Sequence, residues 1–367
     1  MAFHQHHRKL YAASFLFALF CSLFIFVLVI QKSYAAEINK DVSVMYAGSL
    51  VKIMEKVVAP SFHNQTGYNF IGEGKGSVQL SNLILDGFRR PDVFISADTL
   101  PIEKIINHNP PLAQWLVKFA SAELVIAYNP NSPFATDLEK AAKGEIPWYK
   151  VLEEKGFKFR RTDPELDPKG YYTVIAAKLA NIYYNDSTLK NKILGADRNP
   201  EQVFPEEVLR SILDTGQIDA IAAYKHEAVS RGIPYITLAP QINLGDSKYS
   251  NFYNQASYIL HSNQTIIGNP IFFSYTIPVT VRNTDGAIAL ANYLISIQGK
   301  ILLSQVGLNP IRAIVQGDLN SFASCNKRYD SIMTPRCSSS SPPTHKKIKL
   351  YYEYPQYSGI IRHRMLA

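Results

Sequence analysis

Val42-Ser43-Val44-Met45-Tyr46-Ala47-Gly48-Ser49-Leu50 is the stretch of sequence that decides the fold. Its first part, Val42 to Tyr46, is an apolar run with the length and composition of a buried strand. The chain then turns at Ala47, Gly48 and Ser49. Apolar residues follow at helical spacing, at Leu50, Ile53, Met54 and Val57. A buried strand that turns directly into an amphipathic helix is the repeating unit of α/β proteins.

The same alternation of short apolar runs with amphipathic segments continues to about Phe322. Further strands are predicted at residues 69–71, 92–95, 124–128, 220–224 and 272–280. Further helices are predicted at residues 78–85, 170–184, 205–215, 285–298 and 300–306. The turn Gly74-Lys75-Gly76-Ser77 is expected to open the first of these helices, with Lys75 as a solvated turn residue. The pattern predicts an α/β fold, and a body of about 290 residues predicts two lobes.

Both ends of the chain differ from this body. An apolar run from Tyr11 to Ile30 precedes the small-residue site Ser33-Tyr34-Ala35-Ala36, so residues 1–36 are predicted to be a cleaved signal peptide. A retained membrane anchor stays open, because about 20 apolar residues can span a bilayer. Residues 323–367 are rich in serine, proline and basic residues without a clean period, which predicts a low-complexity basic tail.

The net charge of +8 is concentrated in these two end segments. Residues 1–36 carry +3 and residues 325–367 carry +6, which leaves −1 for the body between them. A body with this charge has no electrostatic reason to bind nucleic acid. An anionic ligand would have to be held by a local site.

Six short motifs stand in a recognisable order along the body. They are Tyr46-Ala47-Gly48-Ser49-Leu50, Gly76-Ser77-Val78, Pro91-Asp92-Val93-Phe94-Ile95-Ser96-Ala97-Asp98, Asp167-Pro168-Lys169-Gly170-Tyr171, Gly216-Gln217-Ile218-Asp219 and Tyr224-Lys225. With these motifs the chain resembles the tungstate- and molybdate-binding proteins of ABC importers, in particular the subfamily common in archaea. The resemblance covers the chain from about Val42 to about Phe322.

The resemblance implies a two-lobed periplasmic-binding-protein fold of type II, with the ligand in the cleft between the lobes. The first lobe would comprise residues 37–124 plus 272–322, and the second lobe residues 125–271. The protein would be a monomer in the periplasm, or on the extracytoplasmic face of the membrane if the N-terminal helix is retained. It would bind molybdate or tungstate for an ABC permease in the inner membrane, without a cofactor and without enzymatic activity.

Two predicted helix starts are suited to an oxyanion. Ser49 opens the first helix and Ser77 the second, and each follows a glycine that lets the backbone approach an oxygen closely. Helix N-termini offer several backbone N–H groups that point in one direction. Serine is also an ordinary N-cap, which is the structural alternative at each position. Both serines follow strands at the edge where α/β sheets bind ligands, and this favours a binding role.

Asp167 is unexpected in an anion site, because a carboxylate repels a dianion. It could simply be a turn residue before Pro168. By resemblance, the matching aspartate coordinates the metal centre of the oxyanion, with Gly170 in the same motif, although no free metal cation is bound. The family supplies a second carboxylate at the position of Gln241, so hydrogen-bonded capture without coordination stays open. Tyr224 ends a predicted strand and could donate its hydroxyl to an oxygen or pack in the core.

Other classes of function have weaker support. In Gly72-Glu73-Gly74-Lys75-Gly76-Ser77, Gly76 separates the lysine from the serine, which a nucleotide phosphate loop does not allow. No nucleophile elbow of the Gly-x-Ser-x-Gly type occurs in the chain. The alternatives that remain are a receptor for sulfate or another tetrahedral oxyanion, a membrane-anchored oxyanion sensor, and an enzyme on the same fold.

Overall fold

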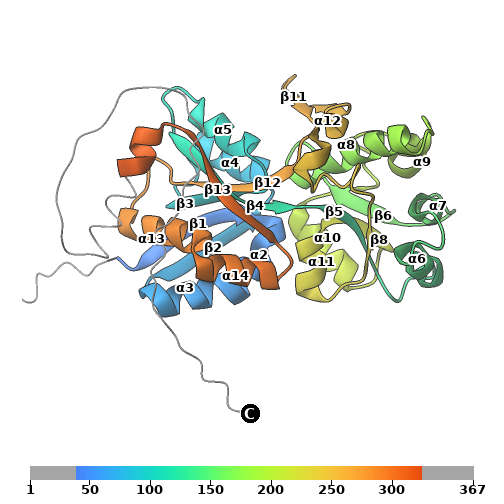
Figure 1. Ribbon diagram of the computed structural model, residues 1–367, viewed down its shortest axis with the longest axis horizontal. Coiled ribbons are helices and arrows are strands. Elements are labelled where there is room, and N and C mark those ends of the chain that lie inside the picture. The colour runs from blue at the N-terminus through green and yellow to red at the C-terminus, as the bar shows by residue number, and fades with distance from the viewer. Residues whose placement is uncertain (1–38, 325–367) are drawn as a thin grey trace, which may run out of the picture. The chain divides into compact units, whose positions relative to one another are not determined.

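A computed structural model describes residues 39–324, apart from the side chains of Arg210 and Asp214 (Figure 1). The predicted signal peptide lies outside the described residues, and so does the predicted tail from Cys325 onward. In the part of the chain that the structure describes, two larger sheets and one two-stranded sheet are formed.

The first sheet has six strands in the order β13-β4-β12-β3-β1-β2. The strands are β1 (Asp41–Ala47), β2 (Asn69–Lys75), β3 (Val93–Ser96), β4 (Trp115–Ala122), β12 (Ile271–Thr276) and β13 (Asn309–Gly317). β1 pairs in parallel with both β2 and β3, whereas β12 runs antiparallel to β3 and β4. The carboxyl ends of β1, β2 and β3 therefore meet at one edge of this sheet.

Helices cover both faces of the six-stranded sheet (Figure 1). They are α2 (Val51–Ile53), α3 (Ala59–Thr66), α4 (Ser77–Leu85), α5 (Leu100–Ile106), α13 (Thr284–Ile295) and α14 (Ile297–Gln305). Successive strand residues point to opposite faces. Val44 and Tyr46 of β1 accordingly join the large core with α3 and α13, while Met45 packs with α4 and α5.

The second sheet has five strands in the order β7-β6-β8-β5-β9. They are β5 (Leu124–Tyr128), β6 (Phe159–Thr162), β7 (Val203–Phe204), β8 (Ala220–Tyr224) and β9 (Tyr235–Thr237). One face packs on α8 (Pro168–Tyr183), and the other packs on α10 (Glu206–Asp214) and α11 (Lys225–Arg231). A single residue, Glu123, separates β4 of the first sheet from β5 of the second.

The remaining elements belong to the chain between β5 and β12. They are α6 (Ala135–Ala142), α7 (Trp148–Leu152), α9 (Leu189–Leu194), η3 (Ser247–Tyr249), α12 (Ser250–Tyr253), β10 (Ser257–Ile259) and β11 (Thr265–Ile267). β10 and β11 form the antiparallel two-stranded sheet. No single helix among residues 39–324 is long and apolar enough to cross a membrane, although the bent pair α13 and α14 passes by length and composition.

The predicted turn at Gly74 and Lys75 is wrong, because both residues belong to β2. A Cβ atom on Gly74 would lie 2.9 Å from the ring of Tyr46 on the neighbouring strand, and one on Gly72 would lie 2.7 Å from it. These glycines therefore make room for the Tyr46 ring within a strand. Lys75 ends this strand, and its partly exposed side chain places the Nζ atom 3.3 Å from Glu207 Oε1.

The helix after β1 also departs from a regular 3.6-residue period. It begins as the 3₁₀ turn η1 (Gly48–Leu50), continues through α2, and contains the π-helical turn η2 (Met54–Val58) before α3. A π-turn adds one residue and shifts the buried face accordingly. For this reason Val58 is buried, while the predicted core residue Val57 is only half-buried. Seven strands among the described residues were not predicted at all, namely β4, β6, β7, β9, β10, β11 and β13.

Candidate functional site

The carboxyl ends of β1 and β2 carry the two predicted serines. Ser77 is fully buried at the start of α4, and its Oγ atom accepts a hydrogen bond of 3.1 Å from the Ala97 N–H. Ser49 lies in η1, directly after β1. Its Oγ atom is buried and has no hydrogen-bond partner within residues 39–324. The two serines thus differ. The Ser77 hydroxyl already accepts a hydrogen bond from the protein, whereas the Ser49 hydroxyl can still bond to a ligand.

Asp167 reaches this region from the five-stranded sheet, at the end of the loop between β6 and α8. It is the N-cap of α8, and Pro168 takes the first helical position. Its Oδ1 atom accepts hydrogen bonds from Lys169 N at 2.9 Å and from Thr162 Oγ1 at 3.2 Å. Burial raises the pKa of the Asp167 carboxyl, and the charge of Lys169 opposes this shift. Asp167 therefore has a structural role, but as the helix N-cap of α8 and not as the turn residue that the sequence allowed.

Two glycines allow this loop to approach its neighbours closely. A Cβ atom on Gly170 would lie 2.6 Å from the backbone nitrogen of Pro164, so the first turn of α8 packs directly on the loop. A Cβ atom on Gly76 would lie 2.5 Å from the carbonyl oxygen of Leu166 and 3.3 Å from Cβ of Asp167. The Leu166 carbonyl also accepts a hydrogen bond of 3.1 Å from the N–H of Gln79 in α4. The start of α4 is thereby in contact with the Asp167 loop. Gly170 lets the first turn of α8 pack closely on the same loop.

Tyr224 ends β8 and lies in the same region. Its side chain is buried, and its hydroxyl has no hydrogen-bond partner in the described part of the chain. Burial, followed by the charge of Asp167, raises the pKa of Tyr224 well above its usual value. Its ring packs edge-on against Phe273 at 5.7 Å, and Lys169 Nζ lies 5.7 Å from the ring centroid.

Gln241 lies in the loop after β9. Its Oε1 atom is buried without a partner among the described residues. The neighbouring Pro240 is held in place, because its carbonyl accepts a hydrogen bond of 2.6 Å from the Tyr253 hydroxyl. Within residues 39–324, Gln241 makes no hydrogen bond to the other predicted site residues. The structure thus brings the start of α4 into contact with the Asp167 loop, and within residues 39–324 it joins Gln241 to neither by a hydrogen bond.

Three predicted site residues share one property that the sequence could not show. A buried polar atom without a protein partner is present in Ser49, Tyr224 and Gln241. Such atoms are uncommon in folded proteins, and each one costs about 1–3 kcal/mol when it stays unsatisfied. Two of them are hydroxyls that can donate, and an amide can turn to offer its NH₂ group. This combination is suited to a ligand that accepts hydrogen bonds.

A buried ion cluster lies beside these residues and was not predicted. Lys169 is 2% exposed, and its Nζ atom lies 2.9 Å from Oε2 of Glu206 and 2.9 Å from Oε2 of Glu227. Burial raises the pKa of Glu206 to about 8, although Lys169 opposes the shift. Burial also opposes ionisation of Glu227, but the charges of Lys169 and His226 and the hydrogen bonds from Tyr224 N–H and Lys169 together outweigh it and lower the pKa of Glu227 to about 2. No pattern in the sequence reveals this cluster, because lysine and glutamate are usually exposed.

Asp98 is another buried acid that the sequence analysis did not single out. It follows β3, and its Oδ2 atom accepts a hydrogen bond from the hydroxyl of Tyr171 in α8. Burial raises the pKa of Asp98, while its hydrogen bond with Tyr171 opposes the shift. This contact links the edge of the six-stranded sheet to α8, one turn after Asp167. It adds a second tie to the one between Gln79 and Leu166.

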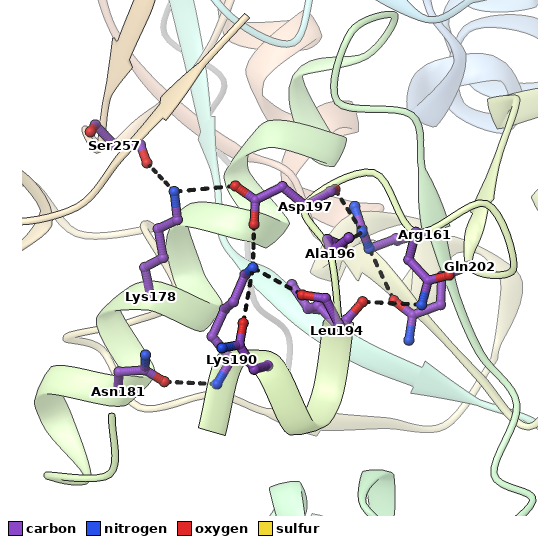
Figure 2. A network of polar contacts seen from close by, with 12 residues as sticks. Arg161, Lys178, Asn181, Lys190, Leu194, Ala196, Asp197, Gln202 and Ser257 are labelled. Carbon is purple, nitrogen blue, oxygen red and sulfur yellow. Dashed lines mark hydrogen bonds and ion pairs between the residues drawn. The ribbon is translucent and has the colours of Figure 1, made fainter. Parts of the chain in front are cut away.

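A polar network holds β6 and α8 from behind (Figure 2). Arg161 is fully buried in β6, and its guanidinium donates to the carbonyl oxygens of Ala196 at 3.1 Å and Asp197 at 2.7 Å. The Asp197 carboxylate forms ion pairs with Lys178 of α8, at 3.4 Å, and with Lys190 of α9. Arg161 directly precedes Thr162, whose hydroxyl donates a hydrogen bond to Asp167. The network therefore fixes the end of β6, where the Asp167 loop begins. No group of histidine, cysteine and acidic residues suited to a metal ion occurs among the described residues.

Solved structures identify the fold. The periplasmic molybdate-binding protein of Azotobacter vinelandii aligns with 73% of this chain and 98% of its own, at a TM-score of 0.52 and 17% identity. The sulfate-binding protein SubI of Mycobacterium tuberculosis aligns with 79% of this chain and 91% of its own, at a TM-score of 0.50 and 15% identity. The fold is therefore the two-lobed periplasmic-binding-protein fold of type II, as predicted. The exact limits of the two lobes stay a prediction.

The chain belongs to the family of bacterial extracellular solute-binding proteins, whose profile matches residues 42–309. A solute-binding protein of Petrotoga mobilis is 32% identical over 286 residues, which cover 75% of this chain and 86% of the relative. The molybdate/tungstate-binding protein WtpA of Pyrococcus abyssi is 29% identical over 251 residues, which cover 63% of this chain and 72% of that protein.

Proposed function

We propose that this protein captures a small tetrahedral oxyanion, with molybdate or tungstate as the first candidates, and delivers it to an ABC importer. The observation that carries the proposal is the pair of buried and unpartnered hydroxyls on Ser49 and Tyr224. An oxyanion surrounded by such groups would replace its hydration by fixed hydrogen-bond donors. These donors are already removed from water in the folded protein, so binding does not add the cost of their desolvation.

The backbone supplies further donors in the same region. α4 begins at Ser77, and its N-terminal N–H groups carry partial positive charge. The hydroxyls of Ser49 and Tyr224 are neutral, so they add donors without the strong hydration of a lysine or arginine side chain. A dianion bound here would be stabilised by the dipoles of these N–H and hydroxyl groups. The negative charge of Asp167 would favour an oxyanion whose central atom can be coordinated by a carboxylate oxygen.

The choice of molybdate or tungstate as the ligand rests on the relatives. WtpA of Pyrococcus abyssi is named as a molybdate/tungstate-binding protein, and the resemblance assigns a coordinating role to the residue at Asp167. A second candidate ligand is sulfate, because Gln241 places a neutral amide where the family has a carboxylate. With one carboxylate instead of two, coordination of a metal centre is weakened relative to simple hydrogen bonding.

We further propose that capture takes place in the periplasm, or at the extracytoplasmic face of the membrane if residues 1–36 are retained. A permease in the inner membrane would receive the oxyanion from a monomer of this protein. The membership of an extracellular family and the apolar run near the N-terminus support this location. Enzymatic activity is not part of the proposal, since the site offers donors but no nucleophile paired with a base.

The proposal is tested by two matched tyrosine variants. Tyr224 and Tyr293 both have a buried hydroxyl without a partner in the described residues, but Tyr293 lies in α13 and packs against Phe62, away from Asp167. Tyr224→Phe should weaken molybdate binding by about ten- to a hundredfold, the value of a hydrogen bond to a charged acceptor. Tyr293→Phe should leave it unchanged. Equal affinities of both variants and the wild type would refute the proposed site.

A further inference from the structure

His226 is a buried polar residue that neither the sequence nor the family resemblance assigns to the site. We propose that His226 is a further ligand-binding residue, which donates one ring N–H to the captured oxyanion and makes its binding dependent on pH. This inference rests on the proposed function, since it adds a donor to the same site. The imidazole ring of His226 would be neutral near neutral pH and could become protonated in acid.

The position of the ring carries the inference. His226 is fully buried, and neither Nδ1 nor Nε2 has a side-chain hydrogen-bond partner within residues 39–324. Its ring stacks on Tyr224 with centroids 5.6 Å apart and an interplanar angle of 18°. A hydrogen bond with the backbone of Ser49 raises the pKa of the ring, so the ring faces that residue. His226 therefore contacts Tyr224 and lies next to Ser49, the two residues whose hydroxyls are also buried and unpartnered.

A purely structural role does not account for the histidine. The ring contacts Phe273 edge-on at 5.3 Å, and a phenylalanine in place of His226 would make the same aromatic contacts with Tyr224 and Phe273. It would do so without burying two polar nitrogens, each of which costs free energy when it has no partner. Three neighbouring residues with unmet hydrogen-bonding capacity indicate one shared ligand that accepts hydrogen bonds.

The charges that face His226 set its response to pH. Glu227 on the same helix favours the protonated ring, and Lys169 of α8 disfavours it. Burial is stronger than both and lowers the pKa of His226 to about 4, so the ring of the free protein is neutral near neutral pH. A bound dianion favours the protonated ring and raises this pKa. Binding should then be accompanied by proton uptake, and affinity should rise as the pH falls toward the raised value.

The test compares His226→Phe and His226→Gln with the wild type in calorimetric titrations with molybdate. His226→Phe keeps the aromatic contacts and should bind about ten- to a hundredfold more weakly. His226→Gln keeps a donor but cannot titrate, so its affinity should change less between about pH 7 and about pH 5 than that of the wild type. His63→Gln, at an exposed histidine of α3, is the control and should behave as the wild type.

The outcomes separate this inference from the proposed function. If the wild type binds no oxyanion, the proposed function is wrong and the inference falls with it. If the wild type binds but both His226 variants keep its affinity and its pH profile, only the inference is overturned. If His226→Phe fails to fold, the proton uptake of the wild type decides, measured in two buffers of different ionisation enthalpy and compared with that of His226→Gln. Equal uptake by the two proteins would contradict the proposal.

Discussion

Lys169→Met is expected to be among the most destabilising substitutions near the site. Lys169 is 2% exposed, and its ammonium lies 2.9 Å from a carboxylate oxygen of Glu206 and 2.9 Å from one of Glu227. Removing one partner of a buried ion pair costs about 3–5 kcal/mol, because an uncompensated charge stays behind. The cost is not doubled by the second acid, since the pKa of Glu206 is about 8 and this group is mostly neutral near neutral pH.

The pH dependence of this loss follows from Glu227. In the wild type its pKa is lowered to about 2, so its stabilising contribution is present above its ordinary pKa of 4.5 and is lost as the pH falls through about 2. Without Lys169 the pKa of the buried carboxyl should rise, and Glu227 should become neutral in mild acid. The destabilisation by Lys169→Met should therefore be smaller at about pH 5 than at about pH 7.5.

Urea-induced unfolding at the two pH values measures this directly. Lys140→Met is the matched control, because Lys140 forms an exposed ion pair of 2.9 Å with Asp137 on α6. It should leave the free energy of unfolding nearly unchanged. A loss below about 1 kcal/mol for Lys169→Met at about pH 7.5, or an equal loss at both pH values, would refute the reasoning.

Four further predictions concern the body boundary, the family aspartate, Gln241 and the buried acid Glu206. A chain that ends after Phe322 should fold and bind as the full chain does, as measured by thermal unfolding and titration, because the α/β pattern ends there; loss of soluble protein would contradict this. Asp167→Asn should weaken molybdate binding more than sulfate binding if Asp167 coordinates the metal centre, whereas tighter binding of both anions would indicate plain repulsion. Gln241→Glu should strengthen molybdate binding in the first case and weaken it in the second. For Glu206, whose pKa is raised from 4.5 to about 8, stability should fall as the pH rises through this window, and unfolding of Glu206→Gln should show a flatter pH profile.

Strands and helices with a clear local period could be predicted from the sequence. β8 has the predicted bounds, Ala220 to Tyr224, because a short apolar run between breakers admits little else. β4 was missed, since Lys118 and Ser121 interrupt its apolar pattern and only pairing with β12 and β13 reveals it. The shift from Val57 to Val58 depends on a π-turn that local periodicity does not encode.

The candidate site was predictable only in part. Ser49 and Ser77 could be placed because both follow strands at the ligand-binding edge of an α/β sheet. The sequence could not show that the hydroxyls of Ser49 and Tyr224 lack hydrogen-bond partners, because this depends on which residues lie near them in the folded chain. Lys169, Glu206 and His226 were missed for a related reason. Such residues are usually solvated, and only the tertiary structure shows that they are buried.

The central claim is that the buried, unpartnered groups of Ser49 and Tyr224 bind a tetrahedral oxyanion. Calorimetric titration of the purified protein with molybdate, tungstate, sulfate and phosphate tests it most directly. The account predicts one-to-one binding of molybdate and tungstate, stronger than that of sulfate or phosphate. Binding of sulfate alone would keep the site but replace the ligand. Absence of binding by all four anions to the folded protein would contradict the account.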